Sequence, residues 1–181
     1  MEIIKTELAG MRVIRPRIFQ DARGSFVKTF HADWFREQGM DFKPCEEFFS
    51  TSAKNVLRGM HFQLPPAAHA KLVYCIAGRA LDVVLDIRKN SPTFGCCHAR
   101  ELNDQNREIV FIPVGFAHGF LALEDGATMV YQTSTVHSPA QDTGIVWNSF
   151  GFGWPVTNPV VSERDRKFPA LRDFQSPFTF A

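Results

Sequence analysis

The sequence has little of what marks a secreted or membrane protein. Its opening residues, MEIIKTELAG, lack the apolar stretch of a secretion signal, and no run approaches the roughly 20 apolar residues of a membrane span. Cysteine is also scarce, with four in 181 residues and none in a CxxC pair. This argues against a disulfide framework and a structural zinc site. We therefore expect a cytoplasmic protein without a membrane span, whose cysteines are free thiols, mostly small core residues.

The sequence also has no large excess of positive or of negative charge. Lys and Arg together number 20 against 19 Asp and Glu, which gives a formal net charge of +1, and no long basic run occurs. Such a balance does not favour binding to nucleic acid or to an anionic membrane surface. We expect neither partner.

What the sequence does have is phenylalanine and short apolar stretches. Phenylalanine occurs 18 times against two tyrosines, and hydrophobic residues make up 45% of the chain, which is typical of a globular protein. Stretches rich in β-branched and aromatic residues alternate with turn signals, and they lie at residues 72–76, 80–86, 108–112, 119–123 and 128–133. This spacing predicts an antiparallel sandwich or barrel.

The other local signals are few. The Ala-Gly-Arg sequence at residues 77–79 predicts a hairpin turn between two strands. Residues 32–38 predict one helix that ends at Gly39, and residues 162–165 predict a short helical turn. No repeat, linker or low-complexity segment is visible. We expect one domain over residues 1–181.

Two motifs carry the candidate chemistry: LRGMHFQ at residues 57–63 and IPVGFAHGF at residues 112–120. Pro-x-Gly-x-x-His resembles the second half of the cupin signature, whose first half carries His-x-His in metal-binding members. That first half reads His61-Phe62-Gln63 here. Residues at i and i+2 of a strand share a face, so Gln63 stands where a second imidazole would meet a metal, and glutamine is a poor ligand for such metals. We predict no metal, and an imidazole at His61 free for general base catalysis.

Further segments match one family in order along residues 12–171. They lie at residues 21–26, 55–63, 71–73, 82–89, 91–95, 113–120, 131–132, 145–148, 154–155 and 162–165. Together they make the chain resemble the dTDP-4-dehydrorhamnose 3,5-epimerase family of the cupin superfamily. The resemblance implies an all-β, cupin-type jelly-roll barrel or sandwich with a few short helices, a homodimer and no cofactor. It also implies metal-independent epimerisation, at C3, C5 or both, of a nucleoside-diphosphate 4-keto-6-deoxysugar in deoxysugar and polysaccharide biosynthesis.

The resemblance also implies roles for four residues. His61 matches the base that removes a proton next to the ketone, and Asp165 matches the acid that orients this histidine. Tyr131 matches the proton donor on the opposite face of the sugar. Lys71 matches a cation near the ketone, where it would stabilise a developing oxyanion. The non-functional alternatives are a core aromatic for Tyr131, a helix cap for Asp165 and a solvated charge for Lys71.

Other residues match substrate-contacting positions of the family. Arg58 and Arg23 match residues that hold the diphosphate, because guanidinium groups suit phosphate oxygens. The full set of predicted binding residues is Arg23, Phe26, Lys28, Glu46, Arg58, Gln63, His118, His137, Asp142 and Arg164. The other histidines, His31, His69 and His98, have no motif support, and we expect them at the surface.

The chain departs from the family pattern where the family reads the nucleotide base. Lys28 stands in place of a usual acidic residue, residues 46–48 read Glu-Glu-Phe in place of Gln-x-Asn, and His137 replaces a stacking aromatic. A site that loses its hydrogen-bonding partners discriminates strongly. We therefore hypothesise a CDP-, GDP- or UDP-linked sugar. The alternative is drift at an open end of the site, with dTDP retained.

Three alternatives for the function stay open. The enzyme could act at C3 only or C5 only, or as a ketoisomerase, since all of these begin with the same enolate. A metal-dependent cupin is disfavoured by Gln63, and a bound transition metal would revive it. A non-catalytic sugar-binding cupin is disfavoured because His61, Lys71, Tyr131 and Asp165 occur together at family positions.

Overall fold

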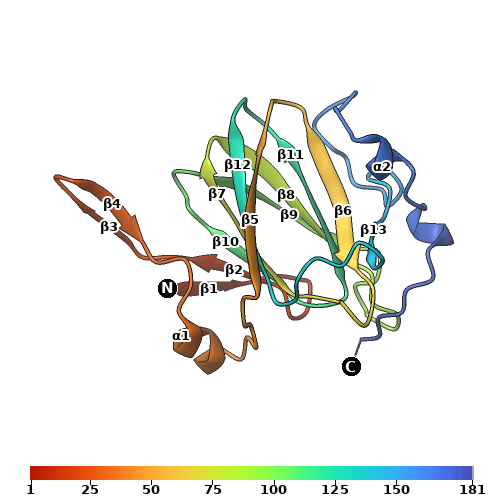
Figure 1. Cartoon of the computed structure of the whole chain (residues 1–181), viewed down its shortest axis with the longest axis horizontal. Coiled ribbons are helices and arrows are strands. Elements are labelled where there is room, and N and C mark those ends of the chain that lie inside the picture. The colour runs from red at the N-terminus through yellow and green to blue at the C-terminus, as the bar shows by residue number, and fades with distance from the viewer. Residues whose placement is uncertain (181) are drawn as a thin grey trace.

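The computed structural model describes residues 1–180 and consists mainly of two antiparallel sheets packed face to face (Figure 1). The six-stranded sheet has the order β1 (Glu2–Lys5), β2 (Arg12–Arg15), β10 (Ile109–Ile112), β7 (Lys71–Ala77), β12 (Ala127–Thr133), β5 (Glu46–Ser52). The five-stranded sheet has the order β13 (Asp142–Gly144), β6 (Leu57–Gln63), β11 (Phe116–Ala122), β8 (Arg79–Asp86), β9 (Cys97–Asn103). The predicted all-β jelly-roll sandwich is confirmed.

The remaining elements lie outside the two sheets. Helix α1 (Ala32–Glu37) begins after His31, whose ring accepts a hydrogen bond from the Trp34 backbone, and Gly39 follows with a φ of +72°. Helix α2 (Glu163–Arg166) is capped by the Ser162 hydroxyl. Both helices were predicted. A 3₁₀ turn, η1 (Leu171–Asp173), lies near the C-terminus, and the hairpin of β3 (Ile18–Asp21) and β4 (Gly24–Val27) projects from the body as an arm (Figure 1).

The predicted hairpin at residues 77–79 is wrong. Strand β7 pairs with β10 and β12, whereas β8 pairs with β11 and β9 in the other sheet. The chain therefore crosses between sheets at Gly78, where φ is +67° and a side chain would press on the backbone of Ala127. Both strands turn apolar residues toward the same core, so the alternation of the sequence cannot distinguish a crossing from a hairpin.

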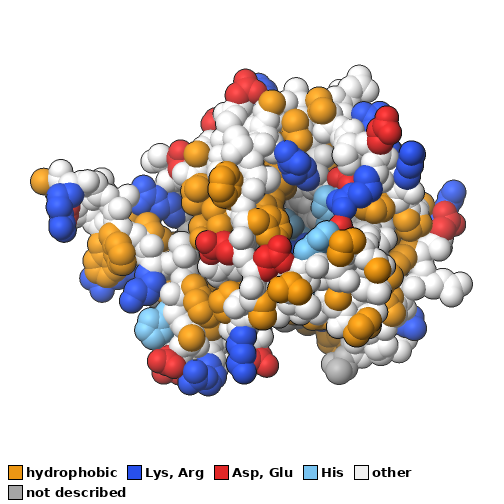
Figure 2. Space-filling view, viewed as in Figure 1, with side chains coloured by type: hydrophobic (Ala, Val, Ile, Leu, Met, Phe, Trp, Pro, Cys, Tyr) orange, Lys and Arg blue, Asp and Glu red, His pale blue; other side chains and the backbone are white. Residues whose placement is uncertain are grey.

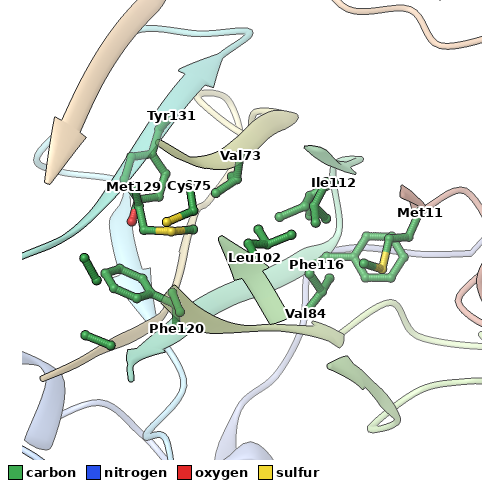
Figure 3. Packing of buried hydrophobic residues seen from close by; sticks show 14 of the residues in the cluster. Met11, Val73, Cys75, Val84, Leu102, Ile112, Phe116, Phe120, Met129 and Tyr131 are labelled. Carbon is green, nitrogen blue, oxygen red and sulfur yellow. The ribbon is translucent and has the colours of Figure 1, made fainter. Parts of the chain in front are cut away.

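The core between the sheets is apolar and closely packed (Figure 3). Val73 and Met129 from the six-stranded sheet meet Val84 and Phe120 from the five-stranded sheet, and all four are fully buried or nearly so. Each such side chain stabilises the fold by roughly 1.5–3 kcal/mol. Tyr131 belongs to this cluster and, like Phe120, also lines the adjoining pocket, so the core holds one end of the site.

A second apolar cluster lies on the outer face of the five-stranded sheet. There the C-terminal part of the chain covers β6 and β11, with Trp154, Val161 and Phe178 packed on Leu57 and Ala117. This packing places α2 against β6 (Figure 1). The residues of α2 therefore lie beside the side chains that β6 contributes to the pocket.

The cysteines agree only in part with what the sequence predicted. All four cysteines are free thiols, as predicted, but only Cys75 is buried, whereas Cys97 is half-buried and Cys45 and Cys96 are exposed. The expectation of core positions was wrong for these last two because Cys45 precedes β5 and Cys96 precedes β9, outside the sheets.

Over residues 1–180, no helix has the length and apolar character needed to span a membrane.

Candidate active site

A cavity of about 280 Å³ opens between the two sheets. Its volume is near the lower end of the roughly 300–1,000 Å³ typical of small-molecule sites, which suits a single sugar ring. Histidine side chains lie at the bottom of this hollow in Figure 2, with acidic and basic side chains around its mouth. Its lining residues are Glu46, Phe48, Ser50, Arg58, His61, Gln63, His69, Lys71, His118, Phe120, Tyr131, Thr133, His137, Asp142 and Arg164.

The pairing of β6 with β11 fixes two histidines of the pocket. His61 and His118 are register partners, and the register shifts between His118 and Phe120. Gly59 and Gly119 face each other there, so that a Cβ on Gly59, whose φ is +147°, would lie 2.5 Å from the Gly119 Cα. Glycine at both positions lets the two strands approach closely enough to bring both imidazoles to one wall.

His61 is held by a carboxylate. Its Nε2 lies 2.9 Å from Asp165 Oδ1, and Asp165 also accepts a hydrogen bond from the Gly59 backbone. Burial acts to raise the pKa of Asp165, but the hydrogen bonds from His61 and the backbone outweigh it and lower the pKa to about 2. Asp165 is therefore an anion at neutral pH and can orient the imidazole.

The pKa of His61 is lowered below its ordinary value, first because the ring is buried, while Asp165 partly offsets this effect. Lys71 and Arg164 contribute positive charge in the same direction. The imidazole is thus neutral at neutral pH and carries a lone pair that can take a proton.

Arg164 lies over His61 at the rim of the pocket. Its Nη2 is 3.0 Å from His61 Nε2, its Nη1 donates to Asp142 at 2.5 Å, and its Nε donates to Asp165 at 3.2 Å. A carboxylate only accepts and a guanidinium only donates, so His61 Nε2 can serve Asp165 or Arg164, but not both at once. The positive charges of Arg164 and Lys71 beside this imidazole would also repel a metal cation.

Tyr131 lies on the opposite sheet and lines the same pocket. It is 8% exposed, its hydroxyl lies 3.4 Å from the Ser50 hydroxyl, and its ring stacks on Phe48. Burial raises the pKa of the phenol well above its ordinary value. The hydroxyl is therefore protonated at neutral pH, as a proton donor requires.

Lys71, at the start of β7, is the cation of the inner wall. Its ammonium group donates to the backbone carbonyl of His61 at 3.0 Å. Burial lowers its pKa to about 8, an effect partly offset by Asp142 and Asp82. Lys71 is thus mainly charged at neutral pH and loses that charge in mildly alkaline solution.

His118 forms a second histidine–carboxylate pair. Its Nε2 lies 2.6 Å from Asp82 Oδ2, and both side chains are almost fully buried. The ring also meets Tyr131 edge to face, with centroids 6.1 Å apart. His118 therefore belongs to the pocket wall of the five-stranded sheet, with its ring against Tyr131 of the other sheet.

The structure brings most of the predicted residues together. His61, Lys71 and Tyr131 line the pocket, and Asp165 lies directly behind His61. Seven of the predicted binding residues also line it, namely Glu46, Arg58, Gln63, His118, His137, Asp142 and Arg164. Arg23, Phe26 and Lys28 do not, because they lie on the arm or just after it, where Phe26 is 60% exposed and Arg23 pairs with Asp21.

The surface position expected for His69 is wrong, because His69 lines the pocket. The backbone of Ser138 donates to Gln63 Oε1, which fixes Gln63 Nε2 as a donor to His69 Nδ1 at 3.0 Å. The remaining proton of a neutral His69 is therefore on Nε2, which is buried and has no partner within residues 1–180. Burial, reinforced by Lys71, lowers the pKa of His69 to about 3, so the ring is neutral at physiological pH.

Sequence reasoning also missed Phe48, Ser50, Phe120 and Thr133, which line the pocket. The sequence pattern could have predicted two of these residues, Phe48 and Ser50. Residues 46, 48 and 50 alternate along β5, and alternate residues share one face of a strand, so the prediction for Glu46 extends to Phe48 and Ser50. The other two histidines do not line the pocket: exposed His31 caps α1, and half-buried His98 pairs with Glu7.

Comparisons with known proteins identify the class of this site. The model of the dTDP-4-dehydrorhamnose 3,5-epimerase family matches residues 5–173. A relative named dTDP-4-dehydrorhamnose 3,5-epimerase from Shigella flexneri is 43% identical over 168 residues, covering 91% of this chain and 93% of its own.

Solved structures agree with the sequence relatives. A dTDP-6-deoxy-D-glucose-3,5-epimerase from Legionella pneumophila, solved in complex with dTDP-4-keto-L-rhamnose, superposes with a TM-score of 0.94 at 33% identity over 99% of both chains. A 3'-monoepimerase from Streptomyces bikiniensis, in complex with dTDP-quinovose, has a TM-score of 0.87 at 32% identity, covering 92% of this chain and 86% of its own.

Proposed function

Because the chain belongs to the dTDP-4-dehydrorhamnose 3,5-epimerase family, we propose that its pocket binds a nucleoside-diphosphate 4-keto-6-deoxysugar between His61 and Tyr131. The chain is an epimerase, an enzyme of the isomerase class. One observation carries the proposed mechanism. A neutral imidazole backed by a carboxylate and a buried phenol stand on opposite sheets around one sugar-sized cavity.

The proposed reaction begins at His61. Its lone pair takes the proton from the carbon next to the ketone, the C–H electron pair forms the enolate, and the imidazole becomes an imidazolium held by Asp165. Lys71 faces the negative charge that develops on the ketone oxygen. General base catalysis and oxyanion stabilisation each contribute roughly 3–5 kcal/mol.

The proposed reaction ends at Tyr131. The phenol gives its proton to the carbon from the opposite face, which inverts the centre and leaves a phenolate beside the Ser50 hydroxyl. The imidazolium and the phenolate then return to their starting states by exchange with solvent. The same cycle at the second carbon next to the ketone gives double epimerisation. The structural likeness to a 3'-monoepimerase keeps inversion at C3 alone as the second candidate.

The nucleotide would lie outside the sugar cavity. A second hollow of about 540 Å³ adjoins it and shares Arg58, His61 and Arg164 with it. Arg58 donates to the Ser52 hydroxyl, which holds its guanidinium at this junction. We propose that Arg58 and Arg164 bind the diphosphate here. The named relatives favour dTDP, while Glu46 and His137 at the mouth support the hypothesis of another base.

We further propose a homodimer. The arm carries Phe19, 47% exposed, and Phe26, 60% exposed, on a two-stranded hairpin that is marginally stable alone. A second copy that covers these rings would stabilise the arm and could bring its binding residues to a pocket. We also propose that residues 1–181 form one domain and that the enzyme is cytoplasmic, since its four thiols are unpaired. Light scattering should give twice the 20.5 kDa of one chain.

The test of the function is a screen in deuterium oxide. dTDP-, UDP-, CDP- and GDP-linked 4-keto-6-deoxysugars are incubated with the enzyme, and NMR follows deuterium at C3 and C5 together with inversion. We expect deuterium to enter with inversion for one nucleotide series. Tightest binding of dTDP would refute the hypothesis of another base. If no sugar exchanges or inverts, the epimerase mechanism is contradicted and a non-catalytic sugar-binding cupin is favoured.

A further inference from the structure

Phe48 makes a direct aromatic contact with the candidate proton donor. Its ring and that of Tyr131 stack with centroids 4.9 Å apart and an interplanar angle of 15°. The two residues are cross-strand register partners on β5 and β12. Both point into the pocket, and Phe48 is 46% exposed where Tyr131 is 8% exposed. Phe48 therefore covers Tyr131 on its open side.

The core packs the buried side of the Tyr131 ring, but polar contacts hold its hydroxyl only weakly. The only hydrogen bond of its hydroxyl within residues 1–180 is to Ser50, and at 3.4 Å this contact is long for two hydroxyls. The other aromatic neighbour, His118, meets the ring edge to face at 6.1 Å. Strand β5 is also the outermost strand of its sheet, so Phe48 has neighbours in the sheet on one side alone. The stack on Phe48 is thus the closest restraint on the open side of the Tyr131 ring.

We propose that Phe48 is a positioning residue that holds the Tyr131 phenol toward the sugar and shields it from water, and so couples proton exchange to inversion. This proposal rests on the function proposed above and deepens it. It assigns a role to a residue that carries no acid or base of its own. Phe48 acts through Tyr131.

The role follows from the two fates of the enolate. The imidazolium of His61 can exchange its proton with solvent and then return a solvent-derived proton to the face it left, which labels the carbon but restores the original sugar. Alternatively, Tyr131 delivers its proton to the other face, which breaks the O–H bond, forms the new C–H bond and inverts the centre. A mobile phenol lowers the second rate alone. The ratio of inversion to exchange therefore reports on Phe48.

We test this ratio with Phe48→Leu and Phe48→Ala in deuterium oxide. Inversion should fall about three- to tenfold, the equilibrium equivalent of a lost aromatic stack, while deuterium exchange stays within about twofold of wild type. Phe48→Tyr and Phe48→Trp keep a stacking ring and should retain the wild-type ratio. Phe94→Ala is the matched control, because Phe94 is 43% exposed and lies away from the pocket.

A second measurement needs no substrate. The chain has two tyrosines, so in a Tyr74→Phe background Tyr131 is the only phenol. Removing the covering ring with Phe48→Ala should lower the pKa of Tyr131 toward its ordinary value of about 10, read from the ultraviolet absorbance of the phenolate. Phe94→Ala should leave this titration unchanged. Thermal unfolding of each variant shows that the fold is intact.

The outcomes separate this proposal from the function on which it rests. Equal losses of exchange and inversion, or no change in either, would overturn the role of Phe48 while leaving the epimerase mechanism in place. An unchanged Tyr131 titration in Phe48→Ala would also count against it. A wild-type enzyme that neither exchanges nor inverts any of the sugars overturns both proposals.

Discussion

The two walls of the pocket are built from opposite kinds of chemistry. The wall on the five-stranded sheet is ionic: His61 is bonded to Asp165, and Arg164 bridges Asp142 and Asp165. Opposite it, the wall on the six-stranded sheet is aromatic and mostly neutral, with Tyr131 packed under Phe48.

In the proposed mechanism, this difference separates the two proton-transfer roles. The charged wall contains a group that changes between neutral and positive, and a fixed carboxylate stabilises the positive form. The apolar wall raises the pKa of its phenol, which keeps the proton in place until the enolate forms. The fold thus gives the proposed base and the proposed acid different environments on opposite sides of one cavity. Lys71 and Glu46 are the charged residues of this wall, and burial lowers the pKa of Lys71.

The largest effect is expected when the ionic wall loses the negative charge of Asp165. In Asp165→Asn, kcat/KM should fall by about 10²-fold or more, because the imidazolium loses its counter-charge. Asp165 raises the pKa of His61, so its loss should also move the acid limb of the pH profile to lower pH. Glu163→Gln on the same helix is the matched control, since Glu163 is exposed and absent from the pocket. Activity within threefold of wild type in Asp165→Asn would argue against this role.

The charge of Lys71 gives a smaller and pH-dependent effect. kcat/KM should rise as His61 loses its proton below pH 6.5, stay level, and fall above pH 8 as Lys71 becomes neutral. Lys71→Met should lower the plateau about 10- to 100-fold and remove the alkaline fall, because the oxyanion loses its cation. Lys71→Arg keeps the charge to higher pH and should shift that fall upward. An unchanged alkaline limb in Lys71→Met would assign the fall to another group.

The spacing of short apolar stretches predicted the sandwich, whereas most of the residues that converge on the pocket were predicted from the resemblance to the family. Alternation in residues 128–133 marks a strand with one buried face, and the motif around His61 lies within a single strand. The same patterns could not predict the crossing at Gly78, because alternation records which face is buried and not which strand is the partner. The position of His69 depends on Gln63, which is itself oriented by Ser138, 75 residues away.

The β3–β4 arm and the contact between Phe48 and Tyr131 show a further limit of prediction from sequence. Arg23 and Lys28 match family positions, yet they lie on or beside a hairpin that projects from the body. From the sequence, Phe48 is only a departure from the family pattern at the end that reads the base. Its contact with Tyr131 depends on the pairing of β5 with β12, and a pattern of apolar residues does not tell which strand is the partner.

The most direct test of the account compares His61→Asn with Tyr131→Phe in deuterium oxide, using the nucleotide sugar that wild type accepts. We expect His61→Asn to show neither deuterium exchange nor inversion, because no base remains to form the enolate. Tyr131→Phe should still exchange but should no longer invert, because the base is intact and the opposite proton donor is gone. Wild-type rates of exchange in His61→Asn, or full inversion in Tyr131→Phe, would contradict the assignment of base and acid to opposite walls.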